Sequence, residues 1–133
     1  MFKNILTVLL GLAVAFITMM IFEFVNSLFF PFPAGMNIND ISQVRAFTQV
    51  LPWTAYILVL TGWATGSLFG GYMMQKYNPG KIILPVITGI LLSILGVINF
   101  IMLTHPIWVI VIGILLLFGG VIIGYRCFHK KKV

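Results

Sequence analysis

A glutamate inside an apolar stretch is the residue of this sequence with the clearest chemical potential. Residues 19–33 read MMIFEFVNSLFFPFP, and Glu23 is one of two acidic residues in the 133-residue chain. Asn26 and Ser27 follow it by three and four positions, which places the three side chains on one face of a helix. A carboxyl group in this setting could carry a proton, form a hydrogen bond or pair with a cation.

Two more polar residues are expected at a similar depth in the membrane. At 1.5 Å per residue, Glu23 lies about 10 Å below the end of its span at Phe30. Asn99 lies at a comparable depth when counted from His105, and Thr61 lies slightly deeper. We therefore predict an intramembrane polar cluster of Glu23, Asn26, Ser27, Thr61 and Asn99.

Three interpretations of this cluster are compatible with the sequence. In the first, a protonated or hydrogen-bonded Glu23 fastens the first three spans together. In the second, Glu23 gains and loses a proton in a carrier, since ionisable residues inside membranes are candidates for function. In the third, it pairs with a cation of another polypeptide or with Arg45 from the loop, because the spans themselves contain no basic residue.

The remaining residues with reactive side chains do not form a catalytic pattern. His105 and His129 are expected on opposite sides of the membrane, so they cannot share a metal ion or a reaction. Cys127 is the single cysteine, which excludes an internal disulfide and a cysteine cluster. No glycine loop of the phosphate-binding type is present. We expect a protein without catalytic activity, without a cofactor and without a metal site.

Composition indicates an integral membrane protein of one domain. Hydrophobic residues make up 61% of the chain and charged residues 8%, whereas soluble domains are roughly one-quarter charged. The formal net charge is +6, but most Lys and Arg residues stand at the ends of apolar segments, where they orient a membrane protein. The lipid bilayer is thus the expected partner, and nucleic acid is not.

Four apolar segments reach the roughly 20 residues that are needed to cross a bilayer. We predict an all-α bundle of four transmembrane helices with short turns at 75–81 and 104–106, which make consecutive helices antiparallel neighbours. The predicted spans are residues 5–30, 51–74, 82–103 and 107–125, with a loop at 31–50 and a tail at 126–133.

The basic residues predict the direction of the spans. Seven of the eight Lys and Arg residues fall on one side if the N-terminus is cytoplasmic, and Arg45 alone falls on the other. Because cytoplasmic segments are enriched in Lys and Arg, we expect a multi-pass protein of the cell membrane with both termini in the cytoplasm.

The long loop contains a pattern that predicts a short helix. Asp40 and Gln43 resemble a capping box, and apolar residues follow at helical spacing, namely Ile41, Val44, Phe47 and Val50 or Leu51. Two placements are open: an amphipathic helix on the outer membrane surface, or a connector that packs over the mouth of the bundle.

Small residues mark the faces on which the helices can approach closely. Gly62, Gly66 and Gly70 form a doubled GxxxG pattern, which favours close helix packing in membranes. The complete set of expected packing residues is Gly62, Gly66, Gly70, Gly89, Ser93, Gly96, Gly113, Gly120 and Gly124. These faces could pack spans two, three and four together, or they could receive a partner or a second copy of the chain.

Two functions follow from these alternatives. The first is an accessory or assembly subunit without catalytic activity, which packs against a larger membrane complex through its glycine-lined faces. The second is an oligomeric small transporter or channel subunit, linked to protons or cations, that uses Glu23.

Overall fold

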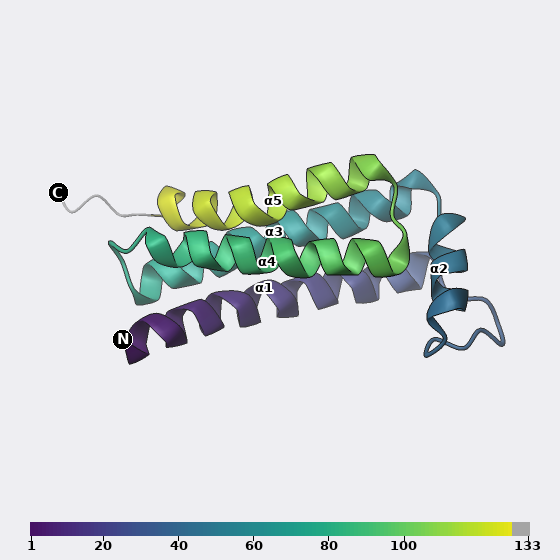
Figure 1. Ribbon diagram of the computed structural model, residues 1–133, viewed down its shortest axis with the longest axis horizontal. Helices are drawn as coiled ribbons and strands as arrows, with labels where there is room; N and C mark the ends of the chain where they lie inside the picture. Colours follow the sequence, from purple (N-terminus) through teal and green to yellow (C-terminus); the bar gives the residue numbers. More distant parts are fainter. Residues whose placement is uncertain (129–133) are drawn as a thin grey trace.

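The computed structural model describes residues 1–128, which form an elongated helical bundle (Figure 1). Its elements are α1 (Phe2–Phe29), α2 (Ile41–Gln49), α3 (Trp53–Tyr77), α4 (Ile83–Leu103) and α5 (Ile107–Cys127). Four of them are long and apolar enough to cross a membrane. The prediction of an all-α, four-span bundle with a short helix between the first two spans is confirmed. Residues 129–133 of the predicted tail lie outside the described part of the chain.

Local sequence explains where the long helices begin and end. Pro52 and Pro106 stand immediately before α3 and α5, where a residue without an N–H group breaks no helical hydrogen bond. Thr104 ends α4 in the left-handed conformation at φ 55°, and its N–H donates to the Phe100 carbonyl at 2.9 Å. Gly80, at φ 85°, allows the tight turn between α3 and α4.

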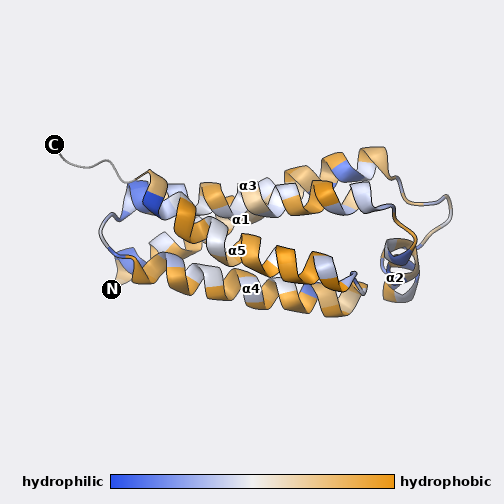
Figure 2. Cartoon of the chain, turned by 90° about the horizontal axis from the view of Figure 1, so that it is seen from above, coloured by the Kyte–Doolittle hydropathy of each residue, from blue (hydrophilic) through white to orange (hydrophobic). Residues whose placement is uncertain are grey.

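Helix α3 is the centre of the bundle. It has extensive contacts with α1 and with α5, whereas α4 packs mainly on α5. Helices α1 and α4 contact each other far less, so the ring of four helices is only loosely closed between them. Hydrophobic residues cover the long helices along their length, and hydrophilic residues gather at the two ends (Figure 2).

The two ends of the bundle differ in charge. Helix α1 begins and helix α5 ends at the same end, here called the terminal end; α2 lies at the opposite end, here called the α2 end (Figure 1). Lys3, Lys76, Lys81 and Arg126 belong to the terminal end, whereas Arg45 belongs to α2. This separation matches the charge pattern from which the direction of the spans is predicted.

The doubled GxxxG pattern of α3 packs against α1. A Cβ atom added at Gly66 would lie 2.7 Å from the Ala15 carbonyl oxygen, and one added at Gly70 would lie 2.6 Å from the Gly11 carbonyl oxygen. At Gly62 the added atom would lie 2.5 Å from the Cβ of Phe22. The backbones of the two helices therefore touch. The sequence interpretation paired spans two, three and four and gave span one no such face.

The other glycines of the predicted set also contact helices of this chain. Gly120 packs against Ser67, Gly124 against the Leu68 backbone and Gly113 against Trp63, which joins α5 to α3. Gly89 packs against Phe118 and Gly96 against Leu117, which joins α4 to α5. Ser93 differs, since its hydroxyl donates to the Gly89 carbonyl at 2.8 Å and it lines a shallow cleft on the surface of α4 and α5.

Hydrogen bonds among three segments close the terminal end. The Asn78 amide donates to Asn4 Oδ1 at 3.1 Å and to Thr7 Oγ1 at 3.3 Å. The Tyr125 hydroxyl donates to the Asn78 carbonyl at 3.0 Å and accepts from the Lys81 backbone N–H at 2.8 Å. These bonds link the start of α1, the α3–α4 turn and the end of α5.

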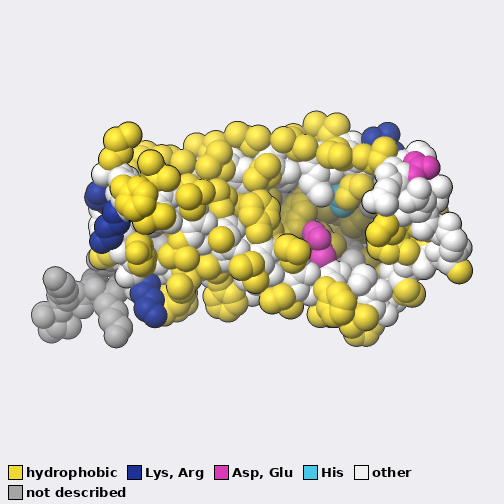
Figure 3. Space-filling view, turned by 90° about the horizontal axis from the view of Figure 1, so that it is seen from below, with side chains coloured by type: hydrophobic (Ala, Val, Ile, Leu, Met, Phe, Trp, Pro, Cys, Tyr) yellow, Lys and Arg dark blue, Asp and Glu magenta, His cyan; other side chains and the backbone are white. Residues whose placement is uncertain are grey.

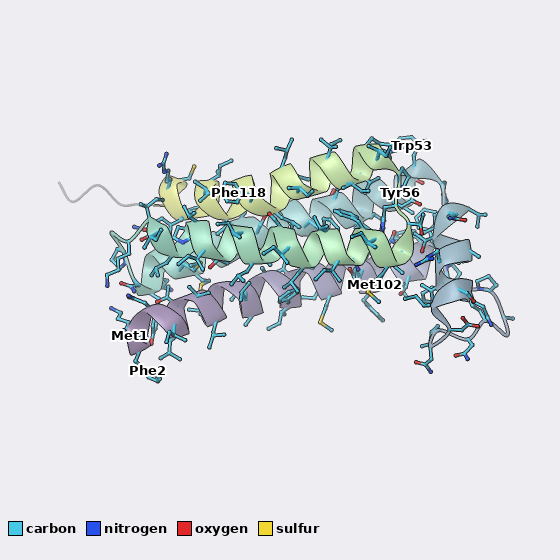
Figure 4. All side chains as sticks on the ribbon, in the orientation of Figure 1. Met1, Phe2, Trp53, Tyr56, Met102 and Phe118 are labelled. Carbon is cyan, nitrogen blue, oxygen red and sulfur yellow. The ribbon has the colours of Figure 1, made fainter. Side chains whose placement is uncertain are left out.

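Helix α2 crosses the end of the bundle (Figure 1). The Tyr56 hydroxyl donates to the Thr48 carbonyl, and Arg45 Nε donates to the Met102 carbonyl at 3.0 Å; Tyr56 and Met102 both lie at the end that α2 crosses (Figure 4). These contacts are those of a connector over the mouth of the bundle.

The N-terminus of α2 is capped differently from the predicted box. The Asp40 carboxylate accepts hydrogen bonds from the Ser42 N–H, at 3.0 Å, and from the Ser42 hydroxyl. These two bonds hold the pKa of Asp40 below its ordinary value. The Gln43 side chain does not return to the Asp40 N–H, as a capping box requires. Its amide oxygen instead accepts from the Asn37 N–H at 2.9 Å, which fixes the preceding turn.

Candidate functional site

Two neighbouring cavities meet at Glu23. One, of about 200 Å³ and here called the α2-end cavity, lies beneath α2 and is bordered by side chains of α1, α2, α3, α4 and the α4–α5 turn. The other, of about 380 Å³ and here called the lateral groove, lies between α1 and α4 over the core residues Trp63 and Leu117. Glu23, Trp63 and Asn99 border both of them.

The lateral groove follows from the packing of the helices. Because α1 packs on α3, and α4 packs on α5, the α1–α4 side is the least tightly closed side of the bundle. Apart from Glu23 and Asn99 its walls are apolar, with Phe16 and Met20 from α1 and with Leu95 and Ile98 from α4. The space-filling view shows this face as hydrophobic, with an acidic side chain at a hollow and a histidine deeper inside it (Figure 3).

Glu23 has no partner among the side chains that the structure describes. Its side chain is exposed at the meeting point of the two cavities, and within residues 1–128 its carboxyl group forms neither a hydrogen bond nor an ion pair. Arg45, the basic residue proposed as its partner within the chain, instead donates to Met102. A fastening role would require hydrogen bonds that this arrangement lacks.

The polar residues predicted around Glu23 are placed unequally. Asn26, Ser27 and Asn99 line the α2-end cavity together with Glu23. The Ser27 hydroxyl donates to the Phe24 carbonyl at 2.7 Å, whereas Asn26 Oδ1 is buried without a hydrogen-bond partner. Thr61 borders neither cavity.

Thr61 and the cavity lie on different sides of α3. The Thr61 side chain is exposed, and its hydroxyl donates to the Ile57 carbonyl of the same helix at 2.7 Å. Trp63, two positions further on, faces the cavities and packs on the Phe100 ring at 4.9 Å between centroids. Two residues correspond to about 200° around a helix, so Thr61 points away from the predicted cluster.

His105 is a residue of the site that sequence reasoning did not include. Its ring lies edge-on to the rings of Phe100 and Tyr56, at 5.2 and 5.8 Å between centroids, and it lines the α2-end cavity. Its Nδ1 is buried without a hydrogen-bond partner in the described chain. Burial lowers the pKa of His105, so the neutral imidazole is favoured. In the sequence, the tight turn at Thr104–Pro106 is the feature that indicates a position of the His105 ring close to the bundle.

Three polar side chains of the site have no hydrogen-bond partner at an atom that can accept. The Glu23 carboxyl group and Asn26 Oδ1 receive no hydrogen bond in the described chain, and a neutral imidazole offers one acceptor nitrogen. No Lys or Arg side chain lines either cavity. Within residues 1–128 no group of three His, Cys, Asp or Glu residues could hold a metal ion. The site is therefore suited to a ligand that brings hydrogen-bond donors and positive charge.

Comparison with protein-family models, curated proteins and solved structures finds no match for this chain. Its four apolar helices are those of a small multi-pass membrane protein. The cavities are therefore the basis for any finer function.

Proposed function

We propose that this chain is a membrane accessory protein without catalytic activity, which binds a component of the surrounding membrane at Glu23 from one side of the bilayer. One observation supports this proposal above others: both cavities occupy the half of the bundle next to α2. Their innermost residues in the long helices are Phe16, Trp63, Leu92 and Leu117. All four lie near the middle of their helices.

Backbone contacts hold the helices together in the other half of the bundle. Gly70 of α3 touches the Gly11 carbonyl of α1, and Gly124 of α5 touches the Leu68 carbonyl of α3. The Asn78 hydrogen bonds then tie the terminal end. A route through the protein would have to separate these helices, which favours binding from one side over passage across the membrane.

A partner of this accessory protein would not need the glycine faces. The eight glycines of the predicted set contact neighbouring helices of the same chain, so those surfaces are already used. The lateral groove offers a different contact, because it is open to the membrane and carries an unpaired carboxyl group. We therefore place the binding function there.

The second candidate function is an oligomeric transporter or channel subunit linked to protons or cations. The observation that favours it is that the Glu23 carboxyl group borders both cavities, one beneath α2 and one facing the membrane. An exposed carboxyl group between two such spaces could exchange protons with each of them.

Two measurements on the full chain separate the candidates. The first is the mass of the complex extracted from native membrane, for the wild type, Glu23→Gln and Thr61→Val. We expect a bound species with the wild type and with Thr61→Val, which changes a polar residue of α3 that lies outside the site. We expect its loss with Glu23→Gln. The second is proton and cation flux in liposomes, where we expect the wild type to match protein-free liposomes. Wild-type flux that Glu23→Gln abolishes would replace the proposal with the transporter.

A further inference from the structure

We infer that the Glu23 site binds a single-chain amphiphile with a primary ammonium head, with the head at Glu23 and Asn26 and the hydrocarbon chain in the lateral groove. The inference rests on the proposed function, because it names the chemical class of the ligand at the same site. It is drawn from the charge, the unpaired acceptors and the shape of the two cavities.

The chemistry of the head group is inferred from the basic side chains that the site lacks and from its unpaired hydrogen-bond acceptors. The Glu23 carboxyl group has no basic partner in the described chain, and neither cavity is bordered by Lys or Arg. If it were ionised without a partner, its charge inside the membrane would be costly, so a cationic head would complement it. A primary ammonium also brings three N–H donors, which suits the buried, unpaired Asn26 Oδ1. A quaternary head supplies the charge but no donor, and a neutral alcohol supplies no charge.

The chain is inferred from the walls of the lateral groove. Phe16, Met20, Leu95 and Ile98 give it an apolar lining, and methionine side chains adapt readily to flexible ligands. Its volume of about 380 Å³ is near the lower end of the roughly 300–1,000 Å³ typical of small-molecule sites. We therefore assign one hydrocarbon chain rather than two.

The position of the site agrees with a ligand that enters from the membrane. Glu23 lies six residues before the end of α1, which corresponds to about 9 Å. The α2-end cavity continues from Glu23 past Ser27 toward α2, so a polar head has polar neighbours on this path. The groove admits the apolar chain sideways, without removing it from the bilayer.

A partner helix fits this groove less well. Packed helices need about 8–10 Å between their axes, so a helix inserted between α1 and α4 would have to part them. These two helices are in contact with each other. A narrow hydrocarbon chain needs no such separation, and for this reason we assign the groove to an amphiphile.

The test uses fluorescence quenching in the full-length chain. Trp53→Phe and Trp108→Phe remove two of the three tryptophans, neither of which borders the cavities, and leave Trp63 as the reporter at the site. The protein is placed in phosphatidylcholine nanodiscs at pH 7. The probes are three amphiphiles brominated at the chain end: undecylamine, undecyltrimethylammonium and undecanol.

We expect saturable quenching of Trp63 by brominated undecylamine, with half-saturation at a membrane mole fraction at least tenfold lower than for the other two probes. Glu23→Gln should raise that half-saturation point at least tenfold, whereas Thr61→Val should leave it unchanged. Equal quenching by the three probes in the reporter chain, which has Trp63 as its single tryptophan and keeps Glu23, overturns the inference. An unchanged half-saturation point in Glu23→Gln overturns it as well.

Failure of this inference can be told apart from failure of the proposed function. A polypeptide extracted with the wild type but not with Glu23→Gln, together with no preference for the amine, removes the ligand class and keeps one-sided binding at Glu23. Flux that depends on Glu23 removes the proposed function itself.

Discussion

At the scale of single residues, the site combines a carboxyl group, an amide oxygen and an imidazole that receive no hydrogen bonds from the described chain. Buried polar groups in folded proteins are nearly always paired. The buried Asn26 Oδ1 and His105 Nδ1, both unpaired within one cavity, therefore distinguish this place from the hydrogen-bonded Asn78 and Tyr125 at the terminal end. The contrast separates a structural polar cluster from the candidate binding cluster in the same chain.

His105 should make stability depend on pH in a defined window. Burial lowers the pKa of this imidazole in the folded protein, so the unfolded chain takes up a proton first, near pH 6.5. Stability is therefore complete above about pH 6.5 and declines as the pH falls below it. Thermal unfolding in detergent between pH 7.5 and 5 should show this decline in the wild type and a flatter profile in His105→Gln.

Other titrating groups are controlled in the same experiment. Glu23 and Tyr56 line the cavity with His105, and Glu23→Gln measured alongside shows what Glu23 contributes. Asp40, whose pKa is held low by Ser42, loses its contribution only at more acidic pH. Identical slopes in the wild type and in His105→Gln would contradict the role given to the imidazole.

At the scale of elements, the contact of α1 with α3 depends on the absence of side chains. Gly66→Ala would place its Cβ 2.7 Å from the Ala15 carbonyl oxygen, and backbone atoms cannot move aside as a flexible side chain can. We expect a loss of about 1–3 kcal/mol in the free energy of unfolding, as is typical of overpacking. Reversible unfolding in mixed micelles measures it.

A glycine on the surface of α5 provides the matched control. A Cβ added at Gly119 would meet no atom within 4 Å. Gly119→Ala should be neutral or should stabilise the chain by up to about 1 kcal/mol, because alanine favours helices. Equal losses in the two variants would mean that α1 does not pack where the structure places it.

The attachment of α2 gives a second prediction at this scale. Tyr56→Phe removes the hydroxyl that donates to the Thr48 carbonyl, a bond worth about 0.5–1.5 kcal/mol. Amide exchange in residues 41–49 should quicken by roughly three- to tenfold, while exchange in α4 and α5 stays the same. Tyr77→Phe, at an exposed tyrosine of the same helix, should change nothing in α2.

The sequence predicted elements better than it predicted their faces. Hydropathy, prolines and turn residues were enough for the five helices, because span length and capping are local properties. The depth of a residue along its span could also be counted, and this count grouped Glu23, Asn26, Ser27 and Asn99. These four residues line one cavity in the structure. The direction in which a side chain points around the helix axis could not be counted in this way. Thr61 was therefore assigned to a cluster that it faces away from. A GxxxG pattern likewise indicates close packing without naming the partner helix.

At the scale of the whole molecule, the direction of the chain in the membrane is the prediction that the function depends on. If the α2 end faces outward, Glu23 opens to the outer half of the bilayer. In a Cys127→Ser background, Ala34→Cys should react with a membrane-impermeant thiol reagent in intact cells, whereas the native Cys127 should react only after lysis. The reverse pattern would place the site in the cytoplasmic half.

The attachment of α1 has a consequence for how the molecule is put together. Helix α1 is joined to the rest of the chain by residues 30–40, which contain no regular helix, yet it is held along its length by Gly62, Gly66 and Gly70 of α3. The other three long helices are linked by short turns and pack on one another. Covalent continuity between α1 and the remainder is thus not what holds them side by side. A gene divided near Gly35 would encode two polypeptides that insert separately and then assemble into the same bundle.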